Sequence, residues 1–274
     1  MNDAGVTRVA PRWLALREPA DAEARARDLV ERLAHALPPS RCRVIHDLGC
    51  GTGAMGRWLG PLLAGRQHWV LHDRDPDLLA LAAADPPGPA ADGAPITLEA
   101  RCTDLARADT RDFSEANLIT ASALLDLLSE DELDRLAGIC AGTGCPTLLT
   151  LSVTGRVEIA PSDPLDRCVA AAFDAHQRRT TDRGRLLGPD AVGFALEAFG
   201  RLGADVLLRP SAWRLGRTHS RLAAEWFSGW VGAACDQEVE LGERCEPYVR
   251  RRLAQAGAGE LEVTVGHADL LVLA

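Results

Sequence analysis

Apolar and polar positions along the chain follow two periods in turn, and this alternation predicts repeated strand–helix units. Short β-branched runs bounded by Gly, Pro or Asp predict strands, whereas apolar residues three or four positions apart predict helices. The expected strands cover residues 43–47, 68–71, 96–102, 117–121, 147–153, 204–208 and 261–273. The expected helices cover residues 12–36, 54–63, 77–84, 130–140 and 189–202. Strands that alternate with helices at this spacing predict a mostly parallel sheet with helices on both faces.

Two segments interrupt this rhythm after the fifth strand, and we interpret them as insertions. The first is rich in Arg, Asp and His, and the second has a helical pattern. Together with the N-terminal helix, which Pro38 and Pro39 should end, they are candidates for a helical cap over a substrate site. The expected division is a cap in 1–40, a core in 41–154, a cap insertion in 155–187, core again in 188–217, a second helical insertion in 218–257 and a final core strand in 258–274.

Composition narrows the class of protein. The 274 residues are 47% hydrophobic, which is enough to bury one enlarged core. Thirty basic residues, all of them Arg, stand against 39 acidic ones and give a formal charge of −9. This charge disfavours nonspecific nucleic-acid binding, which depends on cations that neutralise phosphates. The eight cysteines form no CxxC pair, so we expect neither a metal site nor a disulfide framework.

The N-terminus and the apolar runs indicate where the protein resides. The first thirteen residues lack the apolar stretch of a secretory signal. No run approaches the ~18 uninterrupted apolar residues that a membrane span requires. We therefore expect a cytoplasmic protein that makes no membrane contact.

The most informative segment is a strand that leads into a glycine turn and then into a helix. Asp47 comes just before the glycines, and Gly49, Gly51 and Gly53 follow at alternate positions. Glycines allow a tight turn and let a ligand approach the main chain closely. The N–H groups at the start of the next helix favour a ligand with negative or polar groups. This arrangement predicts a nucleotide-type ligand, whereas a plain tight turn is the alternative.

Two ligand classes compete for this turn. Gly51, Gly53 and Gly56 also satisfy the GxGxxG pattern, which places a diphosphate on the turn. A carboxylate at Asp47 would repel a diphosphate but would attract an amino group and a sulfonium. The acid therefore favours S-adenosylmethionine over NAD.

The segment resembles motif I of the class I S-adenosylmethionine-dependent methyltransferases, D/E-x-G-x-G-x-G. The resemblance implies a Rossmann-like, seven-stranded, mostly parallel sheet with one reversed strand at its edge. It also implies that Asp73 at the end of the second strand binds the ribose, with Asp75 as the alternative. Asp104 would reach the adenine amino group, with Leu105 beside the ring. The other cofactor-binding positions that it implies are Cys50, Arg74 and Ser122.

Methyl transfer needs positioning more than covalent work, so few catalytic residues are expected. Asp126 is the first candidate, because a carboxylate inside a leucine run is costly unless it is exposed or paired. A solvent-facing helix acid is the alternative. His176 is the second candidate, although its helical face with Val169 and Phe173 also suits a core histidine.

Other features of the insertions leave alternatives open. The arginines of residues 178–185 suit either a solvated face or an anionic acceptor. Leu222, Trp226 and Trp230 form a helical stripe that suits either the core or an aromatic lid. His267 and Asp269 lie on an apolar strand face and are left unassigned.

These observations predict a methyltransferase that acts on a small polar or anionic metabolite, with S-adenosylmethionine as its cofactor. The N/D-P-P-Y/F sequence that enzymes acting on base amines or glutamine carry is absent from the turn after the fourth strand. An NAD(P)-dependent oxidoreductase, a non-catalytic binding protein of the same fold and an RNA methyltransferase are the alternatives. The acceptor atom and the oligomeric state are not specified by the sequence.

Overall fold

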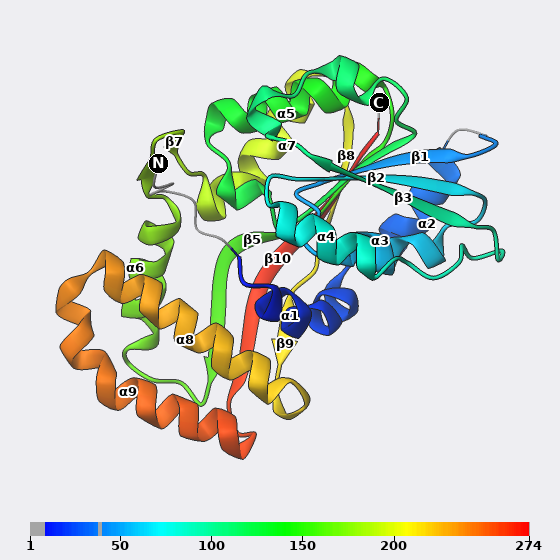
Figure 1. Cartoon of the computed structure of the whole chain (residues 1–274). Helices are drawn as coiled ribbons and strands as arrows, with labels where there is room; N and C mark the ends of the chain where they lie inside the picture. The colour runs from blue at the N-terminus through cyan, green and yellow to red at the C-terminus, as the bar shows by residue number, and fades with distance from the viewer. Residues whose placement is uncertain (1–8, 38–39, 274) are drawn as a thin grey trace.

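A sheet of eight strands forms the centre of the computed structural model, which describes residues 9–37 and 40–273 (Figure 1). The strands are β1 (Arg43–Leu48), β2 (Gln67–Asp73), β3 (Ile96–Cys102), β4 (Leu118–Ser122), β5 (Thr147–Ala160), β8 (Asp205–Pro210), β9 (Trp213–Leu215) and β10 (Glu262–Leu273). Their order is β3-β2-β1-β4-β5-β10-β8, and β9 pairs with β10 beside this path. A separate ladder of two-residue strands joins β6 (Thr180–Thr181) to β7 (Gly184–Arg185).

Helices cover both faces of the sheet (Figure 1). One face carries α5 (Glu130–Thr143) and α7 (Ala191–Arg201), and the other carries α2 (Arg27–Ala36), α3 (Ala54–Leu59) and α4 (Pro76–Ala84). Each face is sealed by its own cluster of buried side chains, which includes Phe199 on the first face and Trp69 on the second. The expected Rossmann-like sheet with helices on both faces is therefore confirmed.

The sheet differs from the expected one in two respects. It has eight strands in place of seven, because the short β9 adds to one end of β10. The reversed strand, β10, does not form the edge. It lies between β5 and β8, antiparallel to both, and leaves β8 as the edge strand.

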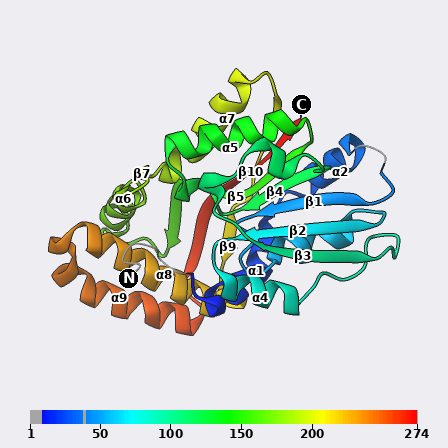
Figure 2. The same cartoon turned by 45° about the horizontal axis from the view of Figure 1, so that its top comes forward.

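The strands β5 and β10 extend beyond the sheet toward a group of cap helices. We expected β5 to end at residue 153 and a cap insertion to begin at 155, but β5 continues to Ala160 because β10 pairs with it along this length. The cap helices α6 (Asp166–Gln177), α8 (Ser220–Gln237) and α9 (Val239–Ala258) pack beside this ladder (Figure 2). Their common core includes Phe227, Trp230 and Tyr248, and Trp213 of β9 belongs to it as well. The division of the chain at the predicted domain boundaries stays a prediction.

The N-terminal segment was expected to form one helix over residues 12–36, and this expectation is wrong. It forms α1 (Pro11–Ala24) and α2, and the helix breaks at Arg25 and Ala26. The backbone N–H of Ala26 donates to the Asp269 carboxylate on β10, 2.8 Å away. This contact with a residue far along the chain replaces a bond within the helix, so no local pattern predicted the break.

Some expectations fall outside the described residues, namely the helix stop at Pro38 and Pro39, positions 1–8 of the cap and residue 274. In the described ranges, no helix combines the length and apolar character needed to cross a bilayer. Nor do three or more His, Cys, Asp or Glu side chains gather there in a way that could hold a metal ion.

Candidate active site at the C-terminal edge of the sheet

A cavity of about 660 Å³ lies between the C-terminal edge of the parallel strands and the cap. The ends of β1, β2 and β4 form its floor, and residues of α1, α6, α8 and β10 form the opposite walls. In open α/β sheets, ligands bind at this edge because the strand ends and the turns after them leave a crevice. Most residues that the sequence analysis selected for a cofactor lie here.

The glycine turn after β1 has the backbone that its sequence predicts. Gly49, Gly51 and Gly53 have φ angles of 65°, 54° and 83°, which side-chain-bearing residues rarely adopt. A Cβ at Gly49 would lie 3.2 Å from Leu124, and a Cβ at Gly51 would lie 3.2 Å from Leu14 of α1. Gly49 and Gly51 line the cavity, whereas Gly53 does not and instead caps α3.

Asp47 lies at the end of β1 with only 1% of its surface exposed. Its Oδ1 accepts a hydrogen bond from Thr120 Oγ1 at 2.8 Å, and no donor in the described part of the chain reaches its Oδ2. Burial raises the pKa of Asp47 to about 7, and the nearby charge of Asp73 acts in the same direction. Thr120 and Arg25 lower this pKa but do not offset the burial. The turn therefore contains a carboxylate that lacks a cation.

Asp73 ends β2 and lines the cavity. Its Oδ2 accepts the N–H of Gly51 at 2.9 Å and its Oδ1 accepts the N–H of Asp75 at 3.0 Å, so it fixes the glycine turn from the neighbouring strand. Asp75 caps α4 by accepting the N–H of Asp77. Both acids and the exposed Arg74 line the cavity, and the choice between Asp73 and Asp75 for a ribose stays a prediction.

The remaining predicted cofactor positions also reach the cavity. Asp104 begins a short 3₁₀ turn after β3, where its side chain accepts the N–H of Ala106, and Leu105 lies beside it. Ser122 ends β4 and Cys50 lies within the glycine turn. Burial raises the pKa of the Cys50 thiol, which disfavours the nucleophilic thiolate form.

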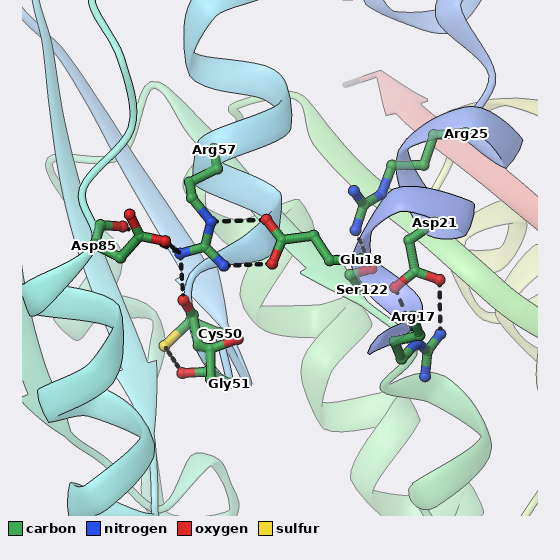
Figure 3. A network of polar contacts seen from close by, with 10 residues as sticks. Arg17, Glu18, Asp21, Arg25, Cys50, Gly51, Arg57, Asp85 and Ser122 are labelled. Atoms are coloured by element: carbon green, nitrogen blue, oxygen red, sulfur yellow. Dashed lines mark hydrogen bonds and ion pairs between the residues drawn. The ribbon is translucent and has the colours of Figure 1, made fainter. Parts of the chain in front are cut away.

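The helix α1 lines the cavity beside the glycine turn and is joined to α3 by polar contacts (Figure 3). Glu18 of α1 accepts two hydrogen bonds from Arg57 of α3, at 2.7 and 2.6 Å. Arg57 also donates to the carbonyl oxygens of Thr52 and Asp85. One guanidinium thus ties α1 to the turn and to the end of α4. The sequence analysis missed this contact because Glu18 and Arg57 are 39 positions apart.

Two further arginines project from α1 and its C-terminal end (Figure 3). Arg17 forms a bidentate pair with Asp21, at 2.9 and 3.1 Å, and lies over the ring of Trp213. Arg25 is 3% exposed and donates from Nη2 to Ser122 Oγ at 3.0 Å. Both line the cavity, and neither was selected from the sequence.

Asp126 follows β4 on a 3₁₀ turn and lines the cavity among leucines. No other residue in the described ranges donates a hydrogen bond to its carboxylate. Burial raises its pKa to about 6, although the charges of Arg17 and Arg179 partly oppose this shift. The carboxylate therefore changes its protonation state close to neutral pH, which suits an acid–base role.

Aromatic side chains that pack in the core of the cap form one wall of the cavity. They are Trp13, Phe173, Trp213 and Trp226. The helical stripe in α8 belongs to the core of the cap, and its Trp226 also lines the cavity. An aromatic lid over an acceptor stays a prediction. The other aromatic residues of this wall come from scattered segments, and no local pattern would have revealed them.

His176 lies off the cavity, although it was selected as a second catalytic candidate. Phe173, Asp174 and Gln177 of the same helix line the cavity, whereas His176 does not. Burial and the nearby charge of Arg179 lower its pKa. We do not carry it into the proposed site.

The structure shows what Asp269 and His267, which the sequence left unassigned, contact. The Asp269 carboxylate accepts from the N–H groups of Ala26 and Leu151 and from Ser211 Oγ. His267 is 5% exposed, packs against Trp213 at 5.2 Å between ring centroids and lines the cavity. Burial lowers the pKa of His267 to about 3, so it is neutral at physiological pH.

Comparisons with known proteins place this geometry in a fold family. No family model matches the sequence, and no curated protein does. A cyclopropane-fatty-acyl-phospholipid synthase-like protein from Lactobacillus casei has a similar structure, with a TM-score of 0.52 at 14% identity over 98% of this chain and 95% of that one. A cyclopropane synthase from Mycobacterium tuberculosis has a TM-score of 0.50 at 13% identity over 99% of each chain. Together with the sheet order, this likeness shows that the chain has the Rossmann-like fold of the class I S-adenosylmethionine-dependent methyltransferases.

Proposed function

We propose that this protein is an S-adenosylmethionine-dependent methyltransferase that acts on a small-molecule acceptor. The observation that carries the proposal is the unpartnered Oδ2 of Asp47, buried beside a glycine turn in a cavity at the ligand-binding edge of this fold. A buried carboxylate oxygen without a donor is unfavourable unless a ligand supplies one. The ammonium group of an aminoacyl ligand would supply both the donor and the compensating charge.

A dinucleotide fits the same turn less well. The environment of Asp47 already penalises negative charge, as its pKa of about 7 indicates. A diphosphate on Gly49 and Gly51 would add further negative charge next to this carboxylate, whereas a ligand with a cationic end would relieve the penalty. This comparison favours S-adenosylmethionine over NAD(P).

The neighbouring residues divide the other parts of the cofactor among them. Asp73 would hold the ribose hydroxyls, because each of its carboxylate oxygens accepts one backbone N–H and can accept a second bond. Asp104 and Leu105 would hold the adenine. The bound cofactor supplies an electrophilic methyl group on a sulfonium.

The cap half of the cavity would bind the acceptor. Asp126 would hold the acceptor by a hydroxyl or amine proton and remove that proton as the methyl group is transferred. The aromatic wall would exclude water and orient the acceptor against Asp126. An acceptor with an apolar or planar body and one polar X–H group matches these surroundings.

The charges of this half favour a polar acceptor over an anionic one. Three of the arginines that line the cavity already have carboxylate partners. These pairs are Arg17 with Asp21, Arg156 with Glu158 and Arg183 with Glu132. An anion that binds to any of them would have to compete with an existing carboxylate partner.

Calorimetric titration with S-adenosylhomocysteine and, separately, with NAD⁺ and NADH tests this proposal. We expect saturable binding of S-adenosylhomocysteine and none of the nicotinamide nucleotides. The reverse preference would identify an oxidoreductase. If S-adenosylmethionine binds but a broad acceptor panel releases no S-adenosylhomocysteine, the protein is a binding protein of this fold.

A further inference from the structure

No carboxylate in residues 9–37 and 40–273 forms an ion pair with the side chain of Arg25. Its surface is 3% exposed, and Nη2 makes its only hydrogen bond within the described ranges, to Ser122 Oγ at 3.0 Å. Its Nε and Nη1 are buried, and no acceptor in the described part of the chain reaches either of them. A guanidinium in this state is costly, because buried cations are normally paired with carboxylates. Arg25 lines the cavity, so a ligand there can reach it.

The acids closest to Arg25 are already bonded elsewhere. Asp21 accepts from Arg17 and from Trp213 Nε1, and Asp269 accepts two backbone N–H groups and a serine hydroxyl. Both influence Arg25 through space, yet burial still lowers the pKa of Arg25. Among the described residues, the acids near Arg25 therefore leave its Nε and Nη1 donors available to a ligand in the cavity.

The position of Arg25 shows which half of the cavity it serves. Leu48 at the end of β1 pairs with Ala121 of β4, so Ser122 lies one step further on, level with the start of the glycine turn. The hydrogen bond to Ser122 therefore holds the Arg25 guanidinium near the glycine turn and away from the aromatic wall of the cavity. Its guanidinium also lies over the ring of Trp58 in α3, 5.1 Å from the ring centroid, which fixes its plane.

The charge of Arg25 lowers the pKa of Asp47, so the two side chains lie near each other, yet no ion pair joins them. A buried, unsatisfied anion and a buried, unsatisfied cation thus face one region without bonding to each other. This combination is complementary to a zwitterion, whose ammonium and carboxylate lie on the same carbon atom. A diphosphate would satisfy Arg25 alone and leave Asp47 repelled.

We propose that Arg25 binds the α-carboxylate of the aminoacyl end of the cofactor, while Asp47 takes its ammonium group. This inference rests on the proposed function, and it makes the junction of α1 and α2 a part of the cofactor site. Asp269 positions Arg25, because its carboxylate holds the N–H of Ala26 and so maintains the break from which Arg25 projects. The planar guanidinium can meet a carboxylate with two parallel hydrogen bonds.

Three ligands separate the contributions to binding. S-adenosylhomocysteine carries both charged groups, its decarboxylated analogue keeps only the amine, and 5′-methylthioadenosine carries neither. Calorimetry on the wild-type protein should show roughly 10- to 100-fold tighter binding of S-adenosylhomocysteine than of the decarboxylated analogue, as expected for charge-assisted hydrogen bonds. Equal affinities for these two ligands would overturn the proposal without the need for any variant.

The variant Arg25→Gln should bind S-adenosylhomocysteine roughly 10- to 100-fold more weakly than the wild type does. It should bind the decarboxylated analogue with the wild-type affinity. The unchanged affinity for the analogue also reports that the variant is folded. Arg12→Gln is the matched control, because Arg12 lies on α1 with its side chain 83% exposed, and it should behave as wild type. An equal loss for all three ligands would show that Arg25 is structural and would contradict the inference.

These outcomes also separate the inference from the proposed function. If the wild-type protein binds none of the three adenosyl ligands, the proposed function itself fails and the inference fails with it. If it binds all three without regard to the carboxylate, the proposed function stands and the role of Arg25 is refuted.

Discussion

Two carboxylates of the cavity, Asp47 and Asp126, illustrate how burial at single positions produces chemistry. Both have raised pKa values, of about 7 and about 6, and burial is the largest cause in each case. Asp47 lies at the glycine turn and has one satisfied oxygen, whereas Asp126 lies toward the cap without a donor from another described residue. The same physical effect underlies the two roles that we propose, cation binding for Asp47 and proton removal for Asp126.

The first prediction concerns the protonation of Asp47 in the ligand-free protein. Burial raises its pKa from 3.8 to about 7, so its contribution to stability is fully present below pH 3.8 and is lost as the pH rises through 7. In Asp47→Asn this loss is removed, and Thr120 can still donate to the amide oxygen. The free energy of unfolding of the wild type should therefore fall relative to that of the variant by roughly 2–3 kcal/mol from pH 5 to pH 7. Urea denaturation at several pH values measures it, and a difference independent of pH would contradict the assignment.

The second prediction concerns Asp126 as a base. Asp126→Asn should lower kcat by roughly 10²- to 10⁴-fold and leave the affinity for S-adenosylhomocysteine unchanged. In the wild-type protein, kcat should rise with pH through about 6, where the carboxylate loses its proton, and this step should be absent from the variant. Once an acceptor is identified, steady-state kinetics across pH 5 to 8 measures both effects. Wild-type rates in the variant would remove Asp126 from the mechanism.

The helix α1 is the element that connects the cap with the glycine turn. Leu14 of α1 lies so near Gly51 that a Cβ there would be 3.2 Å from its side chain. Glu18 of α1 forms a bidentate pair with Arg57, which also donates a hydrogen bond to the carbonyl oxygen of Thr52. The pair is partly shielded from water, with side-chain exposures of 26% for Glu18 and 17% for Arg57. A ligand that enters over the glycine turn therefore meets α1 as part of its binding site.

A third prediction tests this connection. In Glu18→Gln the ion pair is lost, while Arg57 keeps its bonds to Thr52 and Asp85, so α1 alone should loosen. A loss of about 1 kcal/mol corresponds to roughly fivefold faster amide hydrogen exchange in residues 11–24. The control is Glu23→Gln on the same helix, which changes a side chain that is 68% exposed and that contacts His219 at 3.4 Å. Unchanged protection of α1 in Glu18→Gln would show that the pair does not hold the helix.

The same elements show what could be predicted from sequence. Asp47 and the three glycines lie where the strand, turn and helix pattern predicted them, at the end of β1 and just after it. Asp73 at the end of β2 and Asp104 just after β3 lie at the strand ends that the resemblance to the methyltransferase family implied. Arg25 was missed because its position depends on a helix break imposed by Asp269, 243 residues away from Ala26. The continuation of β5 was missed for a related reason, since β10 supplies its pairing partner. Long-range contacts of this kind leave no local period in the sequence.

At the scale of the whole molecule, one ladder joins the core to the cap. β5 and β10 are paired along their length, with one end in the central sheet and the other end in the cap. The cavity lies beside the middle of this ladder, where the two strands pass from the sheet to the cap. In this middle part of β5, Leu151 has a φ of 56°, and its N–H donates a hydrogen bond to the Asp269 carboxylate. A ligand in the cavity contacts both parts and should therefore stabilise the molecule as a whole.

The fourth prediction follows from this arrangement. S-adenosylhomocysteine at about 100 times its Kd should stabilise the fold by roughly 2.7 kcal/mol. For a chain of this length, this corresponds to a rise in Tm of roughly 2–4 °C for each kcal/mol. Differential scanning calorimetry should show the rise, and NADH at equal concentration serves as the comparison. A melting curve that S-adenosylhomocysteine leaves in place would count against the ligand assignment.

The most direct test of the account is a crystal structure of the protein with S-adenosylhomocysteine. We expect the ammonium group within hydrogen-bond distance of Asp47 Oδ2 and the carboxylate on Arg25, with the sulfur facing Asp126. A ligand bound away from the glycine turn, or with its aminoacyl end directed away from both Asp47 and Arg25, would contradict the account.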